Sequence, residues 1–177
     1  MAWRDGLDTT VQDAHRAWVL RGGTGDGRID LSDTDLTGLM AMALTLDRCR
    51  LTRCDLTEAN LRLSTLRNCE LYTCRIANGR LEGAVLQGAL LDHCCLDNAL
   101  LLRSDLRNIE MVNGSARGAN LLGAHLQGSR LIDVDLRNTN LSETVLTDTA
   151  LIRCDLRGAT WTEHTLDGAV LTECVRD

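Results

Sequence analysis

The eight cysteines are the residues of this 177-residue chain that most resemble a chemical site. Cys54, Cys74 and Cys94 lie twenty residues apart, as do Cys154 and Cys174. In a chain that repeats its path every twenty residues, such thiols would stack within reach of a disulfide or a shared metal ion. However, no cysteine pair has a histidine placed as a metal ligand. We therefore favour the interpretation that the thiols are small buried hydrophobic groups without reactivity.

The other residue types that could support catalysis are scattered or missing. The four histidines, at positions 15, 93, 125 and 164, share no metal-binding spacing, and no Ser-His-Asp arrangement is favoured. All 19 basic residues are Arg. The lack of Lys excludes Schiff-base catalysis and the lysine of a nucleotide-binding phosphate loop. We expect neither an enzyme nor a bound metal or cofactor.

The element that must position all these residues is an internal repeat of five. Every fifth residue from Leu31 to Leu171 gives 29 positions, of which 24 are Leu. Two residues before each of these central positions the side chain is usually small, and two residues after it Gly or Asn is common. No insertion breaks this register. The five exceptions to Leu are Ala41, Ile76, Met111, Ala116 and Trp161.

A period of five fits neither an amphipathic helix nor an alternating strand. In an extended segment, the central residue and the small residue two before it point to the same side. Gly and Asn tolerate the left-handed backbone of a corner two residues later. A chain that turns in the same sense after each pentad winds into a solenoid whose interior holds the central residues.

Several pentads resemble the A-(D/N)-L-x-x signature of the pentapeptide-repeat family. The matching runs are Cys54-Asp55-Leu56-Thr57-Glu58, Ala59-Asn60-Leu61, Ala119-Asn120-Leu121 and Cys154-Asp155-Leu156-Arg157-Gly158. The resemblance implies an all-β solenoid, a right-handed quadrilateral parallel β-helix with four pentads per coil and about seven coils. Characterised members of the family imitate the DNA duplex and bind DNA gyrase or topoisomerase IV, which they protect from quinolones or toxins.

The repeat predicts two parts, an N-terminal helical cap over residues 1–27 and the β-helix over residues 28–177. Between Asp8 and Arg21, Val11, Ala14 and Trp18 have helical spacing, and a Gly pair ends the helix. We expect Trp18 to belong to this cap. Trp161 is the bulky central residue of the last coils, where we expect it to cap the other end.

The charged side chains are expected to lie outside, one residue before or after the central position. With coils of twenty residues they form columns on one face, which a partner could recognise. A ladder of ordinary surface salt bridges is the simpler interpretation. The residues of this charged face are Asp35, Asp55, Asp135, Asp155, Arg117, Arg137 and Arg157.

A second face carries outward apolar residues in successive coils. Val112, Ile132 and Ile152 form its row, and Leu90, Ala150 and Val170 lie nearby. A contiguous apolar patch on a surface needs a reason, so we predict a dimer or partner interface there. The C-terminal coil shows no cap, which predicts a tail-to-tail homodimer.

Composition narrows the class of function. A net charge of −6 is unfavourable for direct nucleic-acid binding. No segment is apolar and long enough to span a membrane, and the first residues lack the apolar core of a secretion signal. With eight Cys, these features predict a cytoplasmic protein. We expect a non-enzymatic protein that recognises a partner through its surface. DNA gyrase or topoisomerase IV is the preferred partner, and the alternative is a scaffold for an unrelated protein.

Overall fold

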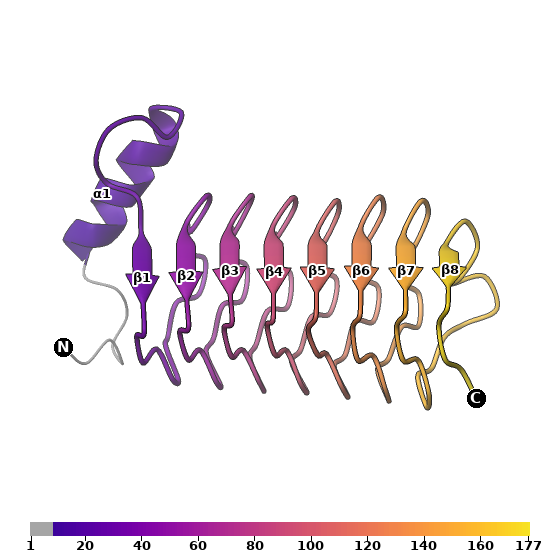
Figure 1. Cartoon of the computed structure of the whole chain (residues 1–177). Coiled ribbons are helices and arrows are strands. Elements are labelled where there is room, and N and C mark those ends of the chain that lie inside the picture. Colours follow the sequence, from indigo (N-terminus) through magenta and orange to yellow (C-terminus); the bar gives the residue numbers. More distant parts are fainter. Residues whose placement is uncertain (1–8) are drawn as a thin grey trace.

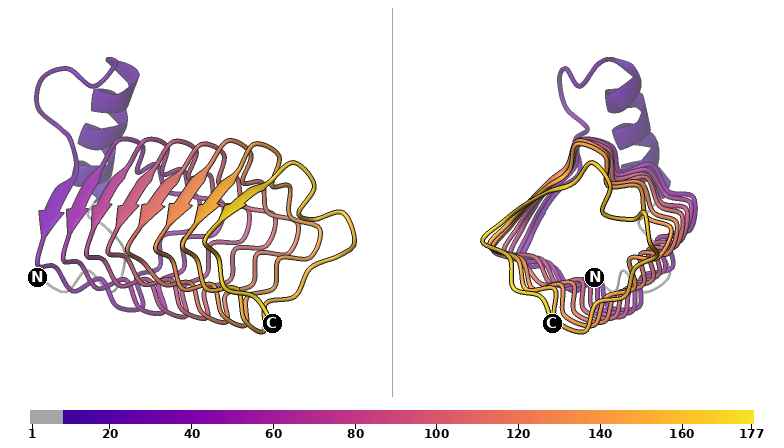
Figure 2. Two further views of the ribbon diagram at one scale, coloured as in Figure 1. Left: turned by 45° about the vertical axis from the view of Figure 1, so that its right-hand side comes forward. Right: turned by 90° about the vertical axis from the view of Figure 1, so that its right-hand side faces the viewer.

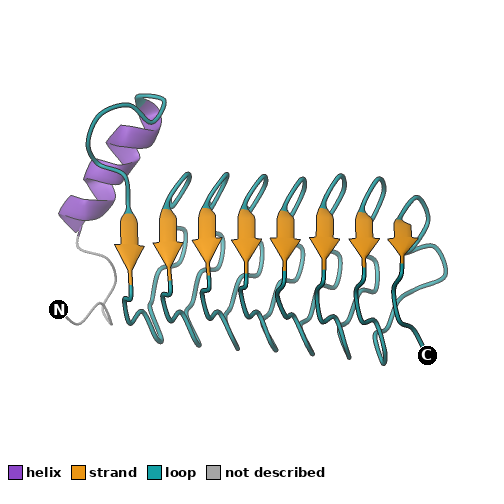
Figure 3. Ribbon diagram, in the orientation of Figure 1, coloured by secondary structure: helices purple, strands orange, loops and turns teal. Residues whose placement is uncertain are grey.

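The structure, a computed structural model, describes residues 9–177 and consists of one helix followed by eight short strands (Figures 1 and 3). The helix, α1, spans Thr9–Leu20. The strands are β1 (Asp30–Ser32), β2 (Arg50–Thr52), β3 (Glu70–Tyr72), β4 (Leu90–Asp92), β5 (Glu110–Val112), β6 (Arg130–Ile132), β7 (Ala150–Ile152) and β8 (Val170–Thr172). Within the described residues, no helix is long and apolar enough to cross a membrane.

The strands form one parallel sheet in chain order, each strand pairing with the next. The register advances by twenty residues, so that Leu31 lies beside Leu51 and Leu151 beside Leu171. Isolated parallel bridges repeat the same offset on the other sides of the coil, as between Asn60 and Arg80. The coils superpose when viewed along the axis, and the chain winds in a right-handed sense (Figure 2). The predicted β-solenoid of about seven coils is confirmed.

Each coil has four sides, which we number by their central residues. Face 1 carries the strands, with central residues 31 to 171 in steps of twenty. Face 2 has central residues 36 to 156, face 3 has 41 to 161 and face 4 has 46 to 166. Central side chains such as Leu61 and Leu81 are completely buried, as are small neighbours such as Ala59. This interior column supplies the hydrophobic driving force for the fold.

The corners explain the polar residues of the repeat. The Asp or Asn before a central Leu accepts a hydrogen bond from the backbone N–H two residues later, as from Thr57 N to Asp55 Oδ1 at 2.9 Å. This side chain therefore stabilises the turn in which it lies. Two residues after the centre, the backbone is left-handed, with φ of 65° at Gly118. A Cβ on Gly118 would lie 2.6 Å from Oδ1 of Asn98 in the preceding coil, so a larger residue there would have to displace the Asn98 side chain.

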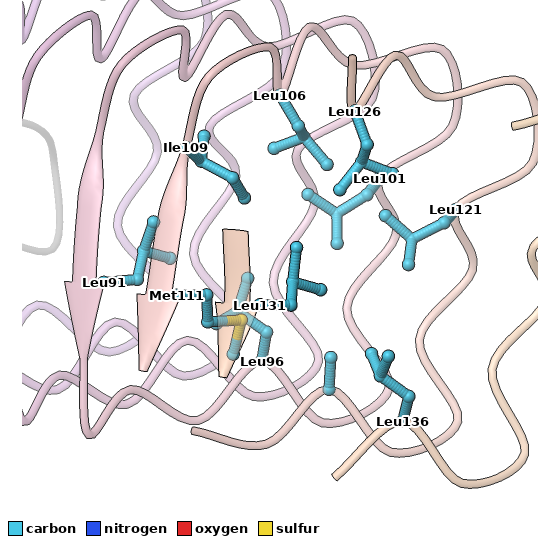
Figure 4. Close-up of a pocket in the computed structure, with 11 residues that line it drawn as sticks. Leu91, Leu96, Leu101, Leu106, Ile109, Met111, Leu121, Leu126, Leu131 and Leu136 are labelled. Carbon is cyan, nitrogen blue, oxygen red and sulfur yellow. The ribbon is translucent and has the colours of Figure 1, made fainter. Parts of the chain in front are cut away.

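The interior is filled except for small apolar voids, of which one lies beside Met111 and Ala116 (Figure 4). Its volume is about 30 Å³, and its lining is entirely hydrophobic. It occurs where Met and Ala replace two central Leu residues. A void without polar partners does not hold ordered water, so we interpret it as a packing defect rather than a ligand site.

Helix α1 forms where the spacing predicts it and ends before Gly22 and Gly23, both left-handed. The N–H of Gly23 bonds to the carbonyl of Trp18 at 3.0 Å, which closes the helix. The buried side chains of the helix are His15 and Trp18. Val11 and Ala14, which share the helical spacing of Trp18, are exposed.

The helix is attached to the first coil rather than laid across its opening. Nδ1 of His15 accepts a hydrogen bond from the N–H of Ile29 at 3.0 Å. The imidazole stacks on Trp18, with 5.7 Å between the ring centres. Viewed along the rod, α1 lies outside the outline of the coils, beside the corner between faces 4 and 1 (Figure 2). It therefore covers this corner of the first coil.

The last coil departs from the repeat between residues 161 and 168. Trp161 is 37% exposed although it occupies a central position, and Thr165 is buried instead. The N–H of Asp148 bonds to the carbonyl of Gly168, twenty residues later. The equivalent bond one coil earlier joins Gly128 and Thr147, which are nineteen residues apart. The expectation of an unbroken register is wrong in this coil, where the central position holds an indole larger than the Leu of other coils. The capping role of Trp161 stays a prediction. The displaced loop lies inside the outline of the coils and extends past them (Figure 2), so it partly covers this end.

Candidate functional site

The cysteines are packing residues in the structure. The Sγ of Cys154 donates a hydrogen bond to the carbonyl of Leu131 at 3.4 Å. Burial raises the pKa of the Cys154 thiol to about 11, which suppresses its reactive thiolate form. A pair absent from the sequence interpretation is Cys49 and Cys69, whose sulfur atoms lie 3.0 Å apart in the core. Among the described residues, no group of three or more His, Cys, Asp or Glu side chains could hold a metal ion.

The histidines have separate environments. His93 lies 2.7 Å from Asp92, and His164 lies 3.1 Å from Asp167, both pairs on the surface. His15 is completely buried, and desolvation lowers its pKa. The structural role of His15 was missed from the sequence, although its position three residues before Trp18 places both on one helix face.

Part of the predicted charged face forms a continuous ladder on face 2. The guanidinium of Arg137 lies 2.6 Å from the carboxylate of its own pentad, Asp135, and 3.6 Å from Asp155 in the next coil. Arg157 pairs with Asp155 at 2.5 Å, and Arg117 lies 3.6 Å from Asp135. Positive and negative groups alternate, so the ladder largely neutralises itself.

The other two predicted acidic residues lie apart from this ladder. Asp35 and Asp55 are neighbours near the N-terminal end of face 2. Arg75, Cys95 and Ser115 occupy the same column between them and the ladder. Asp35 Oδ1 accepts the N–H of residue 37 at 3.0 Å, which gives it the turn-stabilising role of the signature Asp. The structure thus divides the seven predicted residues into two groups.

The ladder predicts a specific acid sensitivity. The hydrogen-bonded Arg157 guanidinium lowers the pKa of Asp155 to about 2, below its unfolded value of about 3.9. The stability from this pair is therefore complete above about pH 4 and is lost as the pH falls toward 2. We expect the melting temperature to fall by about 2 °C more in wild type than in Asp155→Asn over this window. Thermal melts followed by circular dichroism between pH 7 and 2 measure the difference, and identical acid losses would contradict the assignment.

The predicted apolar row is present on face 1. Val112, Ile132 and Ile152 lie side by side on β5, β6 and β7, each half-buried. Ala150 pairs with the exposed Val170 on β8 at the adjoining edge. These residues form one patch.

Leu90 does not join this patch. It lies on β4 beside Glu110, and Arg130 follows Glu110 in the same column. Two charged side chains therefore separate Leu90 from Ala150, its apolar neighbour farther along the column.

The sequence interpretation missed a more exposed apolar group on face 3. Met40, Met42 and Leu63 are 63%, 59% and 59% exposed. All three occupy outward positions of the repeat, so the register contained the signal. We call these three residues the Met40 patch.

Comparison with known proteins identifies the repeat. The family model described as "Pentapeptide repeats" matches residues 45–83 and 115–148 in eight copies. No curated protein matches the sequence.

Solved structures with similarity to this chain include two from cyanobacteria. The pentapeptide repeat protein alr5209 from Nostoc PCC 7120 is 21% identical, with 95% of this chain and 98% of that chain covered and a TM-score of 0.45. Rfr23 from Cyanothece 51142 is 22% identical over 81% and 85%, with a TM-score of 0.44. QnrB1, a plasmid-mediated fluoroquinolone resistance protein, is 15% identical over 84% and 93%, with a TM-score of 0.34.

Proposed function

Because the chain belongs to the pentapeptide-repeat family, we propose that it is a non-enzymatic, cytoplasmic rod that recognises a protein partner through its outer faces. One observation carries this proposal: the central side chains fill the interior, and the void beside Met111 measures only about 30 Å³. A substrate pocket is typically ten or more times larger. The chemical variety of the chain therefore lies on its surface.

The apolar patch on face 1 is the surface that we assign to association, including the homodimer. Its half-buried row from Val112 to Ile152 leaves apolar surface uncovered between charged columns. The partly covered end of the rod, with exposed Val170 and Val175, can extend this interface tail to tail.

Substitution of Ile132 tests this assignment. Ile132→Arg is expected to leave the fold intact, because the side chain points outward, and to abolish self-association. Thr52→Arg is the matched control, since Thr52 on β2 occupies the same position of the sheet as Ile132, four coils earlier. Sedimentation velocity across a concentration series measures the association. A wild-type monomer at all concentrations, or an Ile132→Arg protein that still dimerises, would contradict the assignment.

The finer proposal is that the partner is DNA gyrase or topoisomerase IV, bound through imitation of the DNA duplex. The net charge of −6 and the rod shape support it. The charge distribution is less favourable, because residues 45–139 contain eleven acidic residues and twelve Arg. Residues 140–177 contain seven acidic residues and three Arg, so the acidic excess lies toward the C-terminal end.

A supercoiling assay tests whether the partner is a topoisomerase or an unrelated protein. Purified DNA gyrase is assayed with and without a quinolone, in the presence of increasing amounts of this protein. Inhibition of supercoiling or protection from the drug supports the gyrase proposal. An unchanged reaction under both conditions assigns the rod to a different protein partner and leaves the broader proposal standing.

A further inference from the structure

The Met40 patch is the densest group of exposed apolar side chains on a side of the rod. Met40 and Met42 belong to the first coil, and Leu63 belongs to the second. Among the described residues, the other large apolar side chains that are exposed belong to α1 or to the last coil. Half-buried Leu100, Leu102 and Leu122 form a second apolar group farther along the same face, separated from the Met40 patch by Arg80 and Glu82.

Leu63 is an apolar side chain that the core does not use. It lies at a left-handed corner with φ of 59°, a conformation that this chain also gives to residues such as Arg48 and Thr73. Most of the Leu63 side chain faces solvent. A large apolar side chain exposed beside two exposed Met residues makes a contiguous patch, which indicates a role in recognition.

The charged side chains around the Met40 patch are mainly positive. The charged side chains on the outward positions of face 3 between residues 40 and 123 are Arg62, Arg80, Arg103 and Glu82. Glu82 lies 3.1 Å from Arg80 and 3.8 Å from Arg62, so it is shared between two cations. This N-terminal part of face 3 is therefore positive on a protein whose net charge is −6.

The backbone of face 3 is not free to bind a strand. Asn60 N bonds to Leu39 O at 2.8 Å, and Leu63 N bonds to Glu82 O at 3.1 Å. Such bonds between neighbouring coils consume the groups that an added strand would need. Recognition at this face must use side chains.

We propose that the Met40 patch binds an amphipathic helix of a partner protein, whose apolar stripe is flanked by carboxylates. A helix repeats its stripe every 5.4 Å, close to the roughly 4.8 Å between coils, so two successive turns of the helix can contact Met42 and Leu63 in adjacent coils. Flexible Met side chains adapt to such a stripe. The carboxylates would meet Arg62, Arg80 and Arg103. The inference rests on partner recognition as the proposed function but uses a different face from the association test above.

The test uses a defined probe, an 18-residue fluorescein-labelled helical peptide with a Leu stripe flanked by Glu. Its matched control replaces each Glu with Lys. Fluorescence anisotropy is expected to show binding of the Glu peptide to the full chain, and binding weakened about tenfold or more in Met42→Gln/Leu63→Asn. Ile132→Arg on face 1 is the control variant and should bind like wild type. The double variant should keep its melting temperature, because Asn suits the left-handed corner.

Three outcomes would overturn the proposal. The first is equal binding of the Glu and Lys peptides, or equal binding by wild type and the double variant. The second is self-association of wild type in sedimentation velocity that the double variant loses, which would assign the face to a second copy. The third is binding to vesicles of phosphatidylglycerol and phosphatidylcholine that the double variant loses, which would assign it to a lipid surface. Failure here with a positive Ile132→Arg result would leave the proposed function intact.

Discussion

Replacing Leu61 with Ala is expected to lower the free energy of unfolding by about 2–5 kcal/mol. Leu61 is a central residue with no exposed surface, and its column packs above and below on the central residues of the adjacent coils. Deletion of its isobutyl group leaves a cavity that the neighbouring coils cannot close, because their backbones are hydrogen-bonded at fixed spacing. Urea unfolding followed by circular dichroism measures the change.

The control for this prediction lies two residues away. Leu63→Ala is the same substitution on a side chain that is largely exposed, so its effect is expected to stay within about 0.5 kcal/mol. Comparable losses for Leu61→Ala and Leu63→Ala would show that inward and outward positions of the repeat are not energetically distinct.

Replacing Trp18 with Ala is expected to detach α1 from the rod without unfolding the rod. Trp18 is buried against the chain around Gly23 and Gly27 and stacks with His15. Truncation of a buried Trp costs about 3–5 kcal/mol, and a twelve-residue helix has little stability of its own. Hydrogen exchange should therefore show lost protection over residues 9–20 and unchanged protection over the central coils.

Leu20→Ala serves as the comparison, because Leu20 lies on the same helix but is mainly exposed. It should retain the protection of α1. If Trp18→Ala instead removes protection from the strands as well, the helix is an integral part of the β-helix rather than an attached element.

Much of the fold follows from a single pattern in the sequence. The five-residue register places 24 Leu inside and the charged residues outside, which the burial of the structure matches over nearly all coils. The row from Val112 to Ile152 and the ladder around Asp135 were predictable for the same reason, because residues twenty apart must be neighbours once four pentads form a coil.

The predictions from the sequence failed where a residue does not follow the five-residue repeat. Trp161 occupies a central position but is partly exposed, in the coil where the register breaks. Leu90 was grouped with the apolar patch, yet charged residues of the next two strands separate them. Whether a surface residue joins a patch depends on the residues at the same position in the neighbouring coils. The position of the residue within its own pentad does not reveal them.

The sequence by itself determined the solenoid and the inward or outward direction of each repeat position, because a strict period of five places Leu on one side of every pentad. The four-sided coil came from the family resemblance. The tertiary structure decided which surfaces are distinctive. It showed that His15 and Trp18 attach α1, that residues 161–168 leave the register, and that the Met40 patch is the most exposed apolar group on the sides of the rod. These features depend on the volumes and contacts of individual side chains in three dimensions, on which the repeat pattern places no constraint.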